Sequence, residues 1–189
     1  MRRFVLILML LGMAALLGGC QRATDALAHA AVNLGDGATL RVARHDVLIN
    51  VPTRPEARID ASGALRIGRA AIATTPAQQA LLQRYYQQAR QVSASGVAVG
   101  AAGVALASST LGDVAKAMVQ GKSGQVDAEA HHQAEGVKQA ARTLCAALGT
   151  LAGTQQALAA QLPAFVPYAV IHADAARHCS AGLSNTPQT

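Results

Sequence analysis

Apolar residues spaced alternately four and three apart mark the last third of the chain. They are Val137, Ala141, Leu144, Leu148, Leu151, Gln155, Leu158 and Leu162, with a single glutamine among them. This spacing keeps the residues on one side of an α-helix and is typical of a helix that packs lengthwise against another helix. The sequence therefore predicts a long helix over residues 125–162, ended by Pro163.

A second long helix is predicted over residues 76–120. Thr75 is a good capping residue, and Pro76 fits the first helical turn. Glycines at 121 and 124 then mark a turn, so the simplest partner for the apolar seam is this preceding helix, folded back as a helical hairpin. A seam between two chains is the alternative.

Residues 38–73 have the alternating pattern of a β-meander. Leu40, Val42, Val47, Ile49 and Val51 recur at strand spacing. Ser62-Gly63 separates residues 58–61 from 64–67 as a hairpin turn, and residues 70–73 extend the second strand or add a third. Such a small sheet needs something to pack on.

The expected fold class is therefore α+β and mostly α, with a small N-terminal antiparallel β-hairpin or meander packed on a long helical hairpin. Residues 38–182 form a single domain in this interpretation. Residues 163–182 are its C-terminal cover, with a short strand beside the hairpin at 164–171, and 183–189 are a disordered tail.

The N-terminus has the three parts of a secretory signal: two arginines, an apolar run over residues 4–17, and Gly18-Gly19 before Cys20. Leu17-Gly18-Gly19-Cys20 resembles the lipobox of bacterial lipoproteins. The resemblance implies a signal peptide over residues 1–19, lipid on Cys20 and a lipidated tether over 20–37. The alternative is an ordinary secreted protein whose leader ends near a cysteine.

The residue after the lipidated cysteine carries a further expectation. In that family an aspartate at this position favours retention in the inner membrane, and here it is Gln21. The resemblance therefore implies an outer-membrane location facing the periplasm. Two acyl chains, palmitate for example, suffice for stable anchoring.

Two further cysteines, Cys145 and Cys179, remain in the mature chain. The periplasm is oxidising, so the pair is a disulfide candidate. Two inert thiols are the alternative.

Residues 91–112 contain no charged residue, and Gly96, Gly100, Gly103 and Ala107 recur there at helical spacing. Gly-x-x-x-Gly lets helix backbones approach closely, above all in membranes. Alanine, glycine and serine transfer poorly into hydrocarbon, however, which favours a buried helix of a soluble bundle. Each glycine costs a helix about 1 kcal/mol relative to alanine, so close packing must offset the cost.

Six arginines lie between residues 41 and 69, against Asp46, Glu56 and Asp60. Such a region could contact a protein or anionic lipid through Arg41, Arg44, Arg58, Arg66 and Arg69. The interspersed acids favour a solvated strand face.

Catalytic, cofactor and metal signals are weak. Asp127, His131 and Glu135 are four apart and could share a metal on one helix face, but a solvated helix start explains them better. No nucleophile motif is present. The chain has no tryptophan and is 3% aromatic, which argues against stacking on sugars or nucleic acid. We expect no enzyme activity and no cofactor.

Several stretches carry a family resemblance. Residues 57–60 read Ala-Arg-Ile-Asp, 63–68 Gly-Ala-Leu-Arg-Ile-Gly, 75–79 Thr-Pro-Ala-Gln-Gln and 81–86 Leu-Leu-Gln-Arg-Tyr-Tyr. This series resembles the YggN-like family of uncharacterised Gram-negative envelope proteins. Residues 161–169 are similar to lipoproteins of xanthomonad-type bacteria in the same broad group. The resemblance implies an envelope location and strands followed by long helices, without catalytic residues.

The sequence thus predicts a bacterial envelope lipoprotein with a non-enzymatic structural or interaction role at the periplasmic face of the outer membrane. One alternative is a membrane-perturbing or oligomerising protein that uses residues 91–112. Another is a periplasmic metal or small-ligand carrier, which would need a large apolar pocket.

The lipid anchor can be tested at its cysteine. In cells fed a labelled fatty acid, we expect the unaltered chain to carry label and Cys20→Ser to carry none, because no thiol is left to acylate. Label that persists on Cys20→Ser would contradict the anchor.

Overall fold

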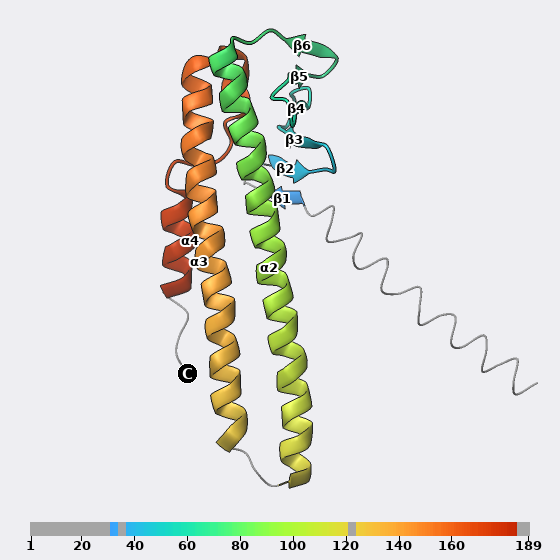
Figure 1. The fold of residues 1–189 in the computed structure, drawn as a ribbon, viewed down its shortest axis with the longest axis vertical. Coiled ribbons are helices and arrows are strands. Elements are labelled where there is room, and N and C mark those ends of the chain that lie inside the picture. Colours follow the sequence, from blue (N-terminus) through green and yellow to red (C-terminus); the bar gives the residue numbers. More distant parts are fainter. Residues whose placement is uncertain (1–30, 34–36, 121–123, 185–189) are drawn as a thin grey trace, which may run out of the picture.

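The computed structural model describes residues 31–33, 37–120 and 124–184, and the side chains of residues 37–108 and 132–184. Two long antiparallel helices, α2 (Pro76–Gln120) and α3 (Gly124–Gln161), lie side by side as a hairpin, and a sheet lies along the first part of α2 (Figure 1). The predicted fold class, α+β and mostly helical, is confirmed.

The sheet has six antiparallel strands that follow one another in chain order. They are β1 (Ala31–Asn33), β2 (Thr39–Val42), β3 (Asp46–Asn50), β4 (Ala57–Asp60), β5 (Leu65–Ile67) and β6 (Ala70–Ile72). The strands are short because turns interrupt them every few residues. A meander of this kind needs a helix behind it, and α2 contacts β2, β3 and β4.

One side of the sheet forms the core with α2 and α3. Alternate residues of the central strands point inward, as the period of two in a strand requires. The buried residues on this side are Leu40, Val47, Ile49, Ala57, Ile59 and Leu65. They meet Leu82, Tyr85, Ala89 and Val92 of α2, so the sheet and the first part of α2 share one core.

Thr75 starts α2 through a reciprocal capping arrangement. Its hydroxyl accepts a hydrogen bond from the Gln78 backbone N–H (3.3 Å), and its own N–H donates to the Gln78 side chain (2.9 Å). The Gln78 amide also donates to the carbonyl of Gln161 (2.7 Å). One glutamine therefore closes the first turn of α2 and ties it to the last residue of α3.

The turn between β4 and β5 sits directly on α2. The amide groups of Gln79 and Gln83 both donate to the Ser62 carbonyl, each at 2.9 Å. Gly63 has a φ of +79°, and a Cβ there would lie 2.5 Å from the Gln79 carbonyl oxygen. Only glycine fits this position, because it needs both a left-handed backbone and a close approach.

The seam of α3 is buried from Leu151 to Leu162 and half-buried from Val137 to Leu148, and its single polar member has a specific role. Gln155 is 1% exposed. Its amide nitrogen donates to the Ile171 carbonyl (2.8 Å), and its amide oxygen accepts the Ile171 N–H (3.1 Å). The glutamine side chain thus takes the place of a backbone hydrogen-bond partner for both the N–H and the carbonyl of Ile171. These two bonds hold the C-terminal segment on the core.

The C-terminal cover differs from the predicted short strand at 164–171. Residues Pro163–Tyr168 form a 3-10 helix, and α4 (Ala175–Ser184) follows it against α3. Phe165 and Tyr168 are buried, and the Tyr168 hydroxyl donates to the Pro55 carbonyl (2.7 Å). Prolines at both ends of the segment remove the N–H groups a strand would need, so a tight helical turn forms instead.

Two boundaries also differ from the prediction. β1 lies inside the predicted tether of residues 20–37, since Val32 pairs with Leu40 of β2. α4 runs two residues into the predicted tail, to Ser184. β1 depends on its pairing with β2 and α4 depends on its packing against α3, so the residues of each element alone do not specify it.

The Gln155 clamp gives a stability prediction. Gln155→Leu should lower the free energy of unfolding by about 3 kcal/mol, because it leaves the Ile171 N–H and carbonyl without partners. Gln156→Leu, at the exposed neighbouring position, should stay within about 0.5 kcal/mol of the unaltered chain. Urea unfolding of both variants checks this, and equal losses would contradict the clamp.

Candidate functional site

Among the described elements, the sheet and α4 lie beside the upper part of the hairpin, while its lower part consists of α2 and α3 alone (Figure 1). We call residues 96–120 the distal half of α2. The uncharged segment predicted at 91–112 falls at the start of this half. The candidate site is the side of this helix that nothing in the described chain covers.

Burial along α2 ends abruptly. Val92 and Ser95 are buried, but no residue from Gly96 to Ser108 is. Val99, Ala102 and Leu106 are half-buried, at helical spacing on the side toward α3. The opposite side is exposed, and we call it the distal face: Val97, Gly100, Ala101, Val104 and Ser108.

The distal face is apolar and offers few hydrogen-bonding groups. Val97 is 42% exposed and Val104 is 70% exposed. The Ser108 hydroxyl donates to the helix's own carbonyls of Val104 (2.9 Å) and Ala105 (3.0 Å), so its donor is already used. A partner would therefore meet methyl groups and exposed helix backbone at the glycines.

The glycines of this half do not pack closely within the chain. Nothing lies within 4 Å of the position a Cβ would take at Gly96, Gly100 or Gly103. We expected close packing to offset their helix cost of about 1 kcal/mol each, and among the described residues α3 does not supply it. The expectation that this segment is a buried helix of a bundle is therefore wrong for residues 96–108.

The facing stretch of α3 has the opposite character. Glu135 accepts a salt bridge from Lys138 (2.8 Å), and Arg142 donates to the Gln139 side chain (3.4 Å). Ala98 of α2 and Ala140 of α3 line one cleft between the two helices. The charged residues around Ala140 therefore lie beside the distal half of α2. The projecting part of the hairpin thus has a segment of α2 without charged residues, up to residue 112, beside a charged stretch of α3.

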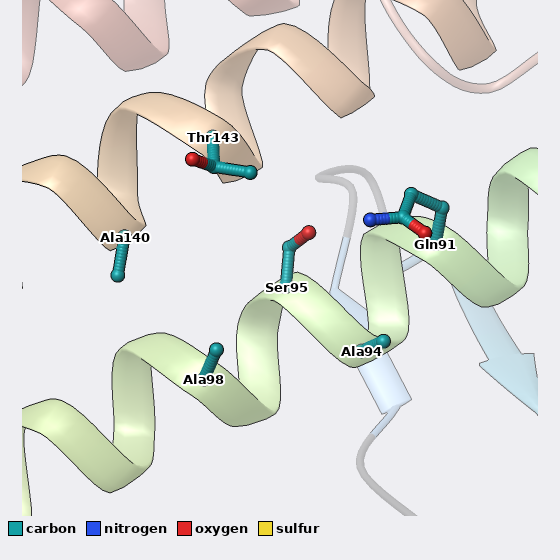
Figure 2. A pocket seen from close by; sticks show the side chains of 6 residues that line it. All are labelled: Gln91, Ala94, Ser95, Ala98, Ala140 and Thr143. Atoms are coloured by element: carbon teal, nitrogen blue, oxygen red, sulfur yellow. The ribbon is translucent and has the colours of Figure 1, made fainter.

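The cleft between the two helices is small. It has a volume of about 270 Å³ and is lined by Gln91, Ala94, Ser95, Ala98, Ala140 and Thr143 (Figure 2). Ligand-binding pockets usually run from roughly 300 to 1,000 Å³ with aromatic or large apolar walls. Alanine, serine and threonine offer little of that contact, so this cleft gives the carrier hypothesis no support.

One described helix segment is long and apolar enough to cross a membrane by length and composition. It is Pro76–Ser108, with an 18-residue stretch of mean hydropathy 1.4 of which 11% is buried. The core helix of a soluble protein passes the same test, but such a helix is mostly buried. Here the apolar stretch is mostly exposed, so the finding agrees with an uncovered surface.

The disulfide between Cys145 and Cys179 is present, with the two Cα atoms 5.5 Å apart. It joins the middle of α3 to α4 on the side of α3 where α4 packs. Neither sulfur is available as a thiolate. The bond locks the C-terminal cover onto the hairpin.

The other predicted site residues are only partly placed. Cys20 lies outside the described residues, and so do the side chains of Asp127 and His131. Glu135 is paired with Lys138. Within the described residues, no three His, Cys, Asp or Glu side chains gather as a metal site.

The exposed valines were missed at the level of sequence, although a signal exists. The apolar seam of α3 begins only at Val137, and residues 127–135 hold Asp127, Glu129 and Glu135. A helix with a polar facing partner cannot bury its apolar residues there. Comparing the two helices residue by residue across the turn would have revealed the uncovered face.

Fold and site together define an α+β chain with a projecting helical hairpin, one helix of which carries an uncovered apolar face. Comparison of the chain with protein-family models, curated proteins and solved structures finds no match. The resemblance to the YggN-like family stays a prediction.

The disulfide gives a second stability prediction. The double variant Cys145→Ala/Cys179→Ala should lose about 3 to 4 kcal/mol of unfolding free energy, because the unfolded chain regains the entropy of a loop spanning 34 residues. Urea unfolding with and without reductant measures this. Reductant should destabilise the unaltered chain and leave the double variant unchanged; an equal response of both would contradict it.

Proposed function

We propose that this chain is a non-enzymatic envelope lipoprotein, anchored through Cys20 to the outer membrane, that binds a protein partner through the distal face of α2. The observation that carries the proposal is the exposure of Val97 and Val104 on the uncharged segment 91–112 of α2, whose glycines have open space beside them. Helices in water normally carry charges on such a side. This one suits a second helix that approaches closely.

The compartment part of the proposal has separate support. A structural disulfide between Cys145 and Cys179 is typical of a chain exported to an oxidising compartment. The leader before Cys20 provides the route for export. Both features agree with a periplasmic location of the described domain.

A protein partner suits the distal face better than full insertion into hydrocarbon. Inserting the hairpin would carry Glu135, Lys138 and Arg142 of α3 into the bilayer with α2. Charged residues at a bilayer centre cost about 2.5 to 3.5 kcal/mol each. Valine and alanine on α2 gain too little to offset this, whereas a docked protein helix leaves the charges of α3 in water.

A second candidate is insertion of α2 alone along a membrane surface, which would make the chain membrane-perturbing. The apolar stretch within Pro76–Ser108 favours it. Crosslinking identifies the molecule that covers Val104, so a single experiment separates the two candidates.

A photo-crosslinking amino acid placed at Val104 of the full chain in living cells should give a discrete protein adduct. The same amino acid at Gln139, exposed on α3, should not. Gly100→Ala/Gly103→Ala should reduce the adduct, since the added methyl groups keep a partner helix away, yet raise the stability of the free chain by about 1 kcal/mol per site.

Gly153→Ala is the matched control. Gly153 is an exposed α3 glycine, and nothing lies within 4 Å of the Cβ position there. It should gain similar stability and leave the adduct unchanged. A Val104 adduct with phospholipid would favour the second candidate, and equal adducts at Val104 and Gln139 would overturn the partner surface.

A further inference from the structure

The strand register places three arginines in one row across the sheet. Arg41 pairs with Leu48, Leu48 with Arg58, and Arg58 with Arg66. Residues paired in this way on antiparallel strands project on the same side. Because the neighbours Val47, Ile49 and Ile59 point into the core, the arginine row lies on the outer side of the sheet, away from α2.

Most of this positive charge has no carboxylate beside it. Arg58 bridges Asp46 (3.4 Å) and Glu56 (3.3 Å). Arg66 donates only to the backbone carbonyl of Arg69 (3.1 Å), and in the described part of the chain Arg41 and Arg69 form no ion pair either. Residues 38–73 hold six arginines and three acids, so the sheet region is net positive.

Two arginines of the row are direct cross-strand neighbours. Arg58 and Arg66 face each other in register on β4 and β5. Asp46 and Glu56 compensate the charge of Arg58, so the uncompensated charge of this pair is that of Arg66. The third acid of the region, Asp60, accepts hydrogen bonds from the Ser62 hydroxyl (2.6 Å) and from the N–H groups of Ser62 and Ala64, all within its own turn. An anion bound on the outer side would balance the charge of Arg66.

The segment before β1 links the sheet to Cys20, the residue of the proposed lipid anchor. β1 starts at Ala31 and is the edge strand of the same sheet. Ten residues separate it from Cys20, a reach of at most about 40 Å. If Cys20 carries the anchor, the sheet is the part of the domain tied most directly to the membrane.

We propose that the outer side of the sheet docks on the phosphate headgroups of an anionic phospholipid surface, through Arg41 and Arg66 of the row, with Arg58 between them and with Arg44 and Arg69 in the adjoining turns. This inference rests on the anchor of the proposed function and not on its protein partner. A guanidinium group can bind a phosphate through two parallel N–H···O hydrogen bonds. An acidic protein fits less well, because the large apolar residue of the row, Leu48, is only 5% exposed and offers no anchor for a protein interface.

The test uses the chain from residue 20 onward with Cys20→Ser, which keeps every described residue but removes the lipid. Vesicles of phosphatidylcholine with phosphatidylglycerol are compared with phosphatidylcholine alone by flotation. The chain should bind the anionic vesicles and release them as salt rises. Arg41→Gln/Arg66→Gln/Arg69→Gln should weaken binding by about 100-fold, since each arginine near an anionic surface contributes several-fold.

The matched control is Arg84→Gln/Arg142→Gln/Arg177→Gln, which has the same net charge but changes exposed arginines of the helices. It should retain most of the binding, and thermal unfolding should show both triple variants folded. No binding to anionic vesicles, or equal losses in the two triple variants, would overturn the docking surface. The Val104 adduct should persist in the sheet variant, so the two proposals fail separately.

Discussion

The structure depends on the first part of α2, residues 76–95, being covered on two sides at once. One side holds the sheet, which could not persist without a helix behind it. The other side holds α3 and, through Phe165, the C-terminal segment. Tyr85 stands at the centre of this arrangement, fully buried, with its ring edge-to-face to Phe165 at 5.5 Å between centroids.

The same packing explains why the distal half of α2 is uncovered. Most of the large buried apolar residues lie where α2 and α3 meet the sheet and the C-terminal segment, around Tyr85, Leu151 and Leu158. From Gly96 to Ala105, α2 has only alanine, glycine and valine, and this part of the helix faces a charged stretch of α3. The helix continues because its backbone hydrogen bonds are internal, but its outer side gains no burial. A partner is the simplest means of covering it.

The two proposed surfaces face different environments. The arginine row lies on the sheet, which the segment after Cys20 would connect to the membrane if the proposed anchor is present. The distal face lies on the part of the hairpin beyond the sheet (Figure 1). An anchored chain could therefore contact headgroups with the sheet while the hairpin meets another protein.

Periodicity and capping predicted much of this fold. The four-and-three seam of α3, the cap at Thr75 and the turn at Gly63 are local patterns, and each is present. The pairing of Cys145 with Cys179 was predicted because they are the two cysteines besides Cys20 and the expected compartment is oxidising. β1 and the 3-10 helix after Pro163 were not predicted, because β1 depends on its pairing with β2 and the 3-10 helix depends on burying Phe165 and Tyr168 in the core. Val104 is exposed because the facing stretch of α3 is charged and has no apolar seam. Periodicity within α2 alone could not show this.

The central claim is that the distal face of α2 is covered in the envelope and uncovered in the free chain. Amide hydrogen exchange tests this directly when the chain in native envelope fragments is compared with the same chain purified. The account predicts slower exchange over residues 97–108 in the envelope, with residues 82–92 unchanged because they are already buried. Equal exchange over residues 97–108 in the two preparations would contradict it.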